Sequence, residues 1–346
     1  MTDKILDTLK ALTAIPGPVG REEMVQEFMR DHLKDFCDSI DSDKIGNLVA
    51  NIDGTGKHYA LVAHADEVGF YVSNIDDNGF IRAKWSTQAH MPDLRLLPGQ
   101  WILFMTEKGL IPGCFCVQTA HIAGPKGKNK LPCWDEIFID VGVSSASDVN
   151  GLGIQIGTPV IYAAPIEKVG SHLMGKPFDD RVGLTVMIMI AEQLSRLPKE
   201  KRPKVTLLST VMEEIGAKGV SAVARELDVD GVIVLEVGLA DDYPGTHGEA
   251  SVSLGKGPVV VVKDSQLVYS HVINKRIFEV AEEKGIEIQR AVYHNYATDG
   301  FPIAAQGQPV STIGVPCRYT HSSFECIDPM DLVKTIDLVF HFLVSG

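Results

Sequence analysis

The second half of the chain alternates short apolar runs with amphipathic segments, and this alternation restricts the fold more than any other feature. The apolar runs predict strands at 205–210, 232–235 and 309–315. The amphipathic segments predict helices at 181–197, 217–227, 270–284 and 329–343. Gly285 is placed to end the third helix, and Asp328 is placed to start the fourth. Strands that alternate with helices indicate the α/β class, with a mostly parallel sheet wrapped by helices.

Residues 71–165 follow a different pattern. Short alternating runs, for example near 69–75, 79–85 and 101–106, are separated by glycine and proline, which is typical of a small β-barrel or sandwich. The segment before them predicts two helices, the second within 19–36, and a strand at 57–63. We therefore predict an α/β domain formed by residues 1–70 and 166–346, interrupted by an inserted β-rich domain at 71–165.

The composition excludes several classes of protein. The chain has 346 residues and a net charge of −13, and it shows no basic stripe of the kind that nucleic-acid binders carry. An anionic membrane would repel it, and its longest apolar run, Leu184 to Ala191, is too short to span a bilayer. Its six cysteines are scattered without a Cys-x-x-Cys pair, which fits reduced thiols in a cytoplasm. These features predict a cytoplasmic protein without nucleic-acid or membrane partners. Its acidity also suits a cation-binding protein or a cationic substrate end, but solubility is the simpler explanation.

Five segments each place an acid or an imidazole just after an apolar run or at the start of a helix. The residues concerned are His64 with Asp66, Asp179 with Asp180, Glu213 with Glu214, Glu236, and His321. Ligands collect at the carboxyl ends of strands in open parallel sheets. Two imidazoles and several carboxylates at that edge suit two divalent ions such as Zn²⁺, Co²⁺ or Mn²⁺.

Each residue also has an ordinary explanation. A lone histidine after a strand is usually a satisfied polar residue, but Asp66 shares a face with His64 and can orient its imidazole. Asp180 is most simply a helix N-cap.

The remaining candidates have similar ordinary explanations. Glu213 and Glu214 can be a solvated acidic turn, although adjacent acids repel each other unless a cation is near. Glu236 ends an apolar strand, where an unpaired carboxylate would be expensive, and His321 can be an exposed loop residue. The shared position of all five segments favours a metal site.

The chain resembles the M42 family of metallo-aminopeptidases, of the glutamyl aminopeptidase type with its tetrahedral relatives. The resemblance is carried by Lys44-Ile-Gly-Asn-Leu48, His64-Ala-Asp-Glu-Val-Gly69, Asp179-Asp-Arg-Val-Gly183, Glu213-Glu-Ile-Gly216, Thr298-Asp299 and His321-Ser-Ser-Phe-Glu325. It implies a zinc-exopeptidase-like fold whose inserted domain serves dimerisation. It also implies a homo-oligomer, for which a dodecamer is one known form, and short peptides as substrates.

The resemblance also implies roles for individual residues. His64, Asp179 and Glu236 would hold one metal ion, and Asp179, Glu214 and His321 would hold the other, so that Asp179 bridges the two. Glu213 would be the general base, and Asp66 would support His64.

The chain departs from the family at two places. Position 236 is usually aspartate in the aminopeptidases, whereas Glu236 matches some carboxypeptidase and acylase relatives, so a carboxypeptidase-like enzyme or an N-acyl amidohydrolase is the alternative. Tyr296 and Ala297 precede Thr298 where the family more often has glycines. Two further alternatives fit less well: a glycosidase leaves the histidines without a role, and a non-enzymatic module leaves the full ligand set unexplained.

Overall fold

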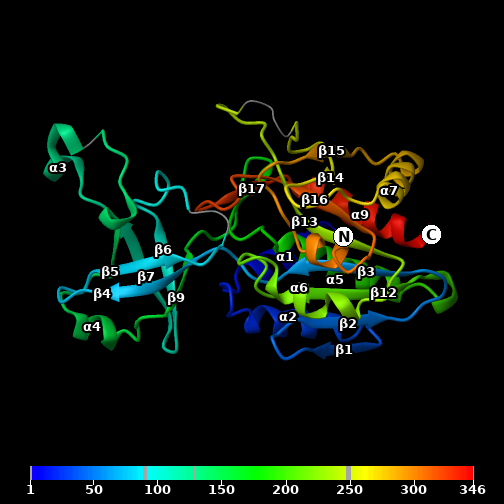
Figure 1. Ribbon diagram of the computed structural model, residues 1–346, viewed down its shortest axis with the longest axis horizontal. Helices are drawn as coiled ribbons and strands as arrows, with labels where there is room; N and C mark the ends of the chain where they lie inside the picture. The colour runs from blue at the N-terminus through cyan, green and yellow to red at the C-terminus, as the bar shows by residue number, and fades with distance from the viewer. Residues whose placement is uncertain (1, 89–91, 128, 247–250, 346) are drawn as a thin grey trace.

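The computed structural model describes residues 2–88, 92–127, 129–246 and 251–345. Figure 1 shows their strands in two separate structures, an eleven-stranded sheet and a closed barrel that stands to one side of it. The sheet contains β1 (Ser39–Ser42), β2 (Leu48–Ile52), β3 (His58–His64), β10 (Glu167–Val169), β11 (His172–Gly175), β12 (Lys204–Thr210), β13 (Gly231–Leu239), β14 (Val259–Lys263), β15 (Gln289–Val292), β16 (Val310–Arg318) and β17 (Glu325–Ile327).

The sheet is parallel only at its centre. Its main order is β1-β2-β12-β3-β13-β16-β17-β11-β10, and β14 pairs with both β16 and β15. Among the described residues four of the ten pairings are parallel, and three of these join β12, β3, β13 and β16. The prediction of a mostly parallel sheet is therefore wrong for the sheet as a whole. Its flanks are antiparallel because short connections such as the one between β10 and β11 can join only antiparallel neighbours.

The barrel consists of six antiparallel strands in the order β4-β5-β8-β7-β6-β9. Its strands are β4 (Phe70–Ile75), β5 (Ile81–Trp85), β6 (Trp101–Thr106), β7 (Gly109–Cys116), β8 (Phe138–Asp140) and β9 (Pro159–Tyr162). Alternate side chains, including Phe70, Phe104 and Phe115, fill its own apolar core. The inserted region is thus a barrel and not a sandwich.

Helices cover the sheet and the barrel. They are α1 (Thr2–Thr13), α2 (Glu23–Leu33), α3 (Ala120–Gly127), α4 (Ala146–Gly151), α5 (Arg181–Ser195), α6 (Lys218–Val223), α7 (His271–Lys284), α8 (Gly300–Ala304) and α9 (Pro329–Val344), with short 3₁₀ helices at Trp134–Glu136, Lys199–Lys201 and Ala224–Glu226. The largest apolar cluster joins α1, α2, α5, α7 and α9 to one face of the sheet, while α6 and α8 pack with a second cluster. No described helix has the length and hydropathy that crossing a membrane requires.

Local signals placed the helix ends well. Gly285 ends α7 with a left-handed φ of 65°, and the Asp328 side chain caps α9 by accepting the Met330 backbone N–H. The second helix occupies Glu23–Leu33 of the amphipathic segment 19–36, and it begins only after the turn at Gly20, whose φ is 80°. Strand β13 is longer than predicted, so Glu236 lies inside a strand and not at its end.

Candidate active site

A cavity of about 830 Å³ opens where the parallel strands end. Its lining includes six of the seven predicted site residues, namely His64, Asp179, Glu213, Glu214, Glu236 and His321. The seventh, Asp66, is fully buried behind the cavity wall. The central strands therefore bring residues from five distant segments into one place.

The topology explains this convergence. His64 is the last residue of β3, Glu236 lies in β13 beside it, and His321 follows the end of β16. Glu213 follows β12, and Asp179 lies two residues before α5. The carboxyl ends of parallel neighbours point to the same edge of a sheet, so their following residues share that edge.

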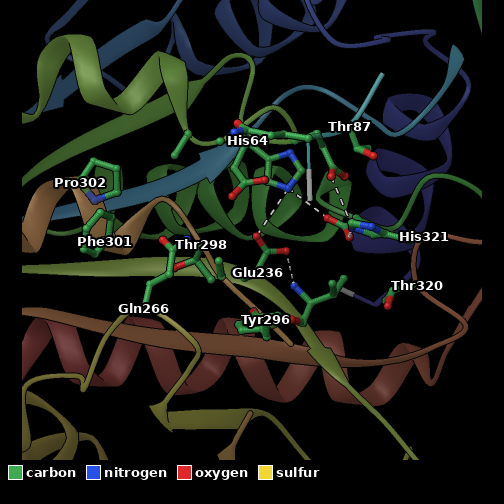
Figure 2. Close-up of a pocket in the computed structure, with 18 of the residues that line it drawn as sticks. His64, Thr87, Glu236, Gln266, Tyr296, Thr298, Phe301, Pro302, Thr320 and His321 are labelled. Atoms are coloured by element: carbon green, nitrogen blue, oxygen red, sulfur yellow. Dashed lines mark hydrogen bonds and ion pairs between the residues drawn. The ribbon is translucent and has the colours of Figure 1, made fainter. Parts of the chain in front are cut away.

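The two carboxylate oxygens of Asp179 face different imidazoles. Oδ1 lies 3.0 Å from Nε2 of His64, and Oδ2 lies 3.5 Å from Nε2 of His321. Glu236 approaches the first imidazole, with 3.5 Å between Oε2 and Nε2, and Glu214 approaches the second at 3.4 Å. Figure 2 shows His64, Glu236 and His321 converging on this point. The arrangement is two adjacent groups of one imidazole and one carboxylate, joined by Asp179.

Charges in this cluster depend strongly on one another. Burial opposes protonation of His64 and His321, but the surrounding carboxylates outweigh it, raising the pKa of His64 well above its usual value and that of His321 to about 9. Burial raises the pKa of Glu214 to about 7 and that of Glu236 to about 8. Burial also acts upward on Asp179, but hydrogen bonds from both imidazoles lower its pKa below the usual value. The carboxylates are therefore stabilised only where positive charge lies between them.

The donor set fits divalent metal ions. Single ligand atoms of His64, Asp179 and Glu214 lie within 4.8 Å of one another, and so do those of His64, Asp180 and Glu236. Oε1 of Glu214 is buried without a hydrogen-bond partner among the described residues, so it is available to a cation. Imidazole and carboxylate ligands suit Zn²⁺, Co²⁺ or Mn²⁺.

The Asp180 side chain accepts hydrogen bonds from two backbone N–H groups. Its Oδ1 accepts the Gly183 backbone N–H at 2.9 Å, which makes it the N-cap of α5. Its Oδ2 accepts the backbone N–H of His64 at 3.2 Å. The N-cap explanation of Asp180 is confirmed, and its second contact ties α5 to the end of β3.

Two buried carboxylates hold the loop after β12 by three consecutive backbone N–H groups. Glu22 accepts the N–H of Met212 at 3.1 Å, and Asp66 accepts those of Glu213 and Glu214, each at 3.0 Å. Met212 has a left-handed φ of 55°, a conformation that a non-glycine residue keeps only when its surroundings enforce it. Burial, followed by nearby carboxylates, raises the pKa of Glu213 well above its usual value, although His64 opposes the shift. Asp66 therefore contacts the acidic loop more closely than the sequence suggested, and Glu22 carried no sequence signal.

Asp66 also lies next to His64, as predicted. The imidazole Nδ1 is 3.1 Å from the Asp66 backbone oxygen and 3.5 Å from its carboxylate Oδ1. An acceptor at Nδ1 leaves Nε2 facing the cavity, which is the nitrogen that a metal would use.

The barrel contributes to the cavity as well. Thr87 and Gln88 follow β5 and line the cavity, and the Gln88 backbone N–H donates to the Glu214 carbonyl at 3.0 Å. Figure 2 shows Thr87 and Thr320 at one end of the cavity, while Phe301 and Pro302 lie at the other. Sequence reasoning missed Thr87 and Gln88 because a contact between the barrel and the sheet leaves no periodic signal in either.

The segment that departs from the family pattern forms part of the wall. Tyr296 is buried, and its hydroxyl donates to the Val237 carbonyl at 2.7 Å, beside Glu236. Asp299 is buried and accepts the Thr210 hydroxyl at 2.5 Å. Tyr296 thus adds an aromatic ring to the wall at a position where glycine would leave space.

Comparison with known proteins gives a consistent result. The model of the M42 glutamyl aminopeptidase family matches residues 46–338. A lysyl aminopeptidase of Pyrococcus furiosus is 30% identical over 96% of this chain and 94% of its own length.

Two solved structures share the fold. An aminopeptidase of the archaeon Desulfurococcus kamchatkensis superposes with a TM-score of 0.92 at 31% identity, covering 100% of this chain and 96% of that one. The TET1 peptidase of Pyrococcus horikoshii, which can assemble into a tetrahedron or a large octahedral shell, gives a TM-score of 0.88 at 27% identity over 98% of this chain and 99% of that one.

Proposed function

Because the chain belongs to the M42 glutamyl aminopeptidase family, we propose that it is a two-metal aminopeptidase that removes N-terminal residues from short peptides. Membership makes the chain an exopeptidase, a metal-dependent hydrolase of peptide bonds. One observation carries the finer proposal: the two oxygens of Asp179 face two different imidazoles, as a carboxylate that bridges two ions must. Sites with two metals a few ångströms apart are typical of aminopeptidases.

We assign the ligands from these distances. His64, Asp179 and Glu236 would hold one ion, and Asp179, Glu214 and His321 would hold the other. The unpartnered oxygen of Glu214 supports the second assignment. Zn²⁺, Co²⁺ and Mn²⁺ all suit this donor set.

Glu213 is the proposed general base. Divalent ions, when bound, lower the pKa of water and polarise a carbonyl group. The Glu213 carboxylate lines the cavity, takes the proton from the attacking water and delivers it to the leaving amine. Asp66 fixes the Glu213 backbone, which keeps this carboxylate aimed into the cavity. The carboxylates of the cavity also attract the positively charged N-terminus of a peptide.

Substitution of Glu213 by glutamine tests the base directly. We expect Glu213→Gln to keep its bound metal and to lose turnover by at least about a hundredfold, because the amide cannot accept the proton. Glu282→Gln, at an exposed position on α7, is the matched control and should behave as wild type. Metal content by elemental analysis and peptide hydrolysis are measured together, and near-normal turnover in Glu213→Gln would remove it from this role.

A second experiment addresses Glu236 and the alternative substrates. Free-amine peptides and aminoacyl anilides should be cleaved, whereas their N-acetylated forms and C-terminal positions should not. Chelation should abolish this activity, and Zn²⁺, Co²⁺ or Mn²⁺ should restore it. Cleavage that favours N-acylated substrates would instead support the amidohydrolase alternative.

We also propose that the chain is a cytoplasmic homo-oligomer, with residues 71–165 as the dimerisation domain and a dodecamer as one assembly. The named assemblies of the Pyrococcus horikoshii TET1 peptidase support this proposal, as do large exposed apolar side chains of the barrel region such as Trp101 and Ile122. All six cysteines are free, which supports a reducing compartment. Light scattering after gel filtration measures the assembly, and a monomeric protein would contradict it.

A further inference from the structure

A buried ion pair lies directly behind Asp179 and has no role in the site described above. Lys176 and Glu325 are both buried, and Lys176 Nζ lies 3.7 Å from Glu325 Oε1. Glu325 belongs to β17 and Lys176 follows β11, the strand paired with β17. Two charges removed from water are expensive, and an apolar pair of similar size is often equally stable or more so. Stability alone is therefore a weak explanation for this pair.

The second oxygen of Glu325 indicates what the pair does. Oε2 accepts the backbone N–H of Phe178 at 2.6 Å and that of Asp179 at 3.1 Å. These two groups belong to the loop that carries the proposed bridging ligand. Hydrogen bonds to an ionised acceptor are stronger than neutral ones, so the loop is held at the residue whose position matters most.

We propose that Glu325 is a positioning residue that fixes Asp179 through these two backbone groups, with Lys176 as the buried counter-ion that keeps Glu325 in place. The inference rests on the proposed function, because it concerns a ligand assigned there. Glu325 is not among the described residues that line the cavity, and its hydrogen bonds go to the Asp179 loop, so it acts through that loop. Neither Lys176 Nζ nor Glu325 Oε1 has a hydrogen-bond partner among the described residues, which leaves the pair's attraction electrostatic.

Two variants distinguish the effect of the Glu325 hydrogen-bond acceptor from the effect of its charge. Glu325→Asp keeps the charge beside Lys176 but withdraws the acceptor by about 1.5 Å, the length of one carbon–carbon bond. The double variant Lys176→Met with Glu325→Gln removes both charges but keeps an oxygen that can accept the two N–H groups. Asp331→Asn is the control, because Asp331 is also a buried carboxylate that accepts two backbone N–H groups, those of Gly255 and Gly257, outside the cavity lining.

The main measurement is the affinity of metal-free protein for Co²⁺, from its visible absorption in competition with a chelator. We expect Glu325→Asp to weaken binding by at least about tenfold, the usual effect of losing an outer-shell partner. The double variant should stay within about threefold of wild type, and Asp331→Asn should bind normally even where its melting temperature falls. Melting of the metal-free forms shows which variants remain folded.

The remaining outcomes overturn the proposal. Normal affinity in Glu325→Asp means that the acceptor does not position Asp179, and an equal loss in both variants means a general packing effect. A loss confined to the double variant assigns the effect to charge. If wild-type protein binds no Co²⁺, the proposed function fails instead, so the two failures are distinguishable.

Discussion

Asp66→Asn is the sharpest test of how the acidic loop is held. Asp66 is fully buried, and its two oxygens accept the backbone N–H groups of Glu213 and Glu214 separately. Asparagine keeps one oxygen and presents an NH₂ group to the other N–H. One charge-assisted hydrogen bond is lost, and one backbone donor remains buried and unpaired.

The size of the effect follows from these contacts. Loss of a hydrogen bond to a charged group costs about 1.5–3 kcal/mol, and a neutral acceptor weakens the bond that remains. We therefore expect the free energy of unfolding to fall by about 3 kcal/mol. Because the Glu213 side chain is attached to the backbone segment that Asp66 holds, a shift of this segment by about 1 Å would lower kcat by about a hundredfold. The KM should change less, since the cavity residues outside this loop stay in place.

The assay compares Asp66→Asn with Asp331→Asn, whose side chain makes the same kind of double contact outside the cavity. Denaturant unfolding gives the stability of each, and hydrolysis of an aminoacyl anilide gives kcat and KM. Both variants should lose stability, but only Asp66→Asn should lose turnover. The reasoning is refuted if Asp66→Asn retains its kcat, or if both variants lose the same fraction of it.

Three further predictions concern pH, metal binding and specificity. Burial, followed by the charge of Asp66, raises the pKa of Glu22 from 4.5 to about 7, so the folded state holds this proton more tightly and loses stability as pH rises from 4.5 to 7. The stability of Glu22→Gln relative to wild type, measured as the free energy of unfolding in denaturant, should therefore be greater at pH 8 than at pH 5 by up to about 3 kcal/mol. An equal difference between the two proteins at both pH values would contradict this. Glu236→Asp withdraws the carboxylate from His64 by about 1.5 Å, so elemental analysis at the same free metal concentration should find less bound metal than in wild type. Full occupancy would show that a side chain of either length can hold the metal. Phe301 and Pro302 give one end of the cavity an apolar surface, so leucyl anilides should exceed lysyl and glutamyl anilides in kcat/KM by about tenfold. A reversed order would exclude this end as the side-chain pocket.

The sequence carried enough information to predict the central strands and the convergence of the acids and imidazoles at one cavity. Runs such as Val205–Thr210 are too apolar and β-branched for a surface segment, and polar residues directly after them collect at one sheet edge. The helix end at Gly285 depends on the backbone freedom of glycine, and the helix start at Asp328 depends on its capping side chain, so neighbouring residues in the sequence were sufficient to predict both. The proposed ligands could be selected because most of them follow an apolar run or precede a helix in the sequence.

Other features depend on contacts that local sequence does not encode. Glu236 lies inside β13 because Val237 to Leu239 continue to pair with Val315 to Cys317, and the length of that pairing is set by the partner strand. The antiparallel flanks of the sheet follow from which strands meet, and apolar patterning is the same for either direction. Lys176 and Glu325 are far apart in the chain and meet only because β11 pairs with β17.

The distribution of positive charge around the cluster gives the strongest physical reason for bound cations. Arg181 is fully buried with its guanidinium nitrogen 3.7 Å from Glu67, and Lys176 is buried against Glu325, so these two permanent cations lie outside the cavity lining and are already paired. Lys218 does line the cavity, but it is exposed and forms no ion pair with the described carboxylates of the cluster. The oxygens of Asp179, Glu214 and Glu236 that face the cluster lie next to imidazoles, which supply positive charge only when protonated. A proton on an imidazole removes the lone pair that would otherwise bind a metal, so protons and divalent ions compete for the same cluster. Since imidazole protons are lost as pH rises, divalent ions become the more effective counter-charge under the conditions in which Glu213 can act as a base.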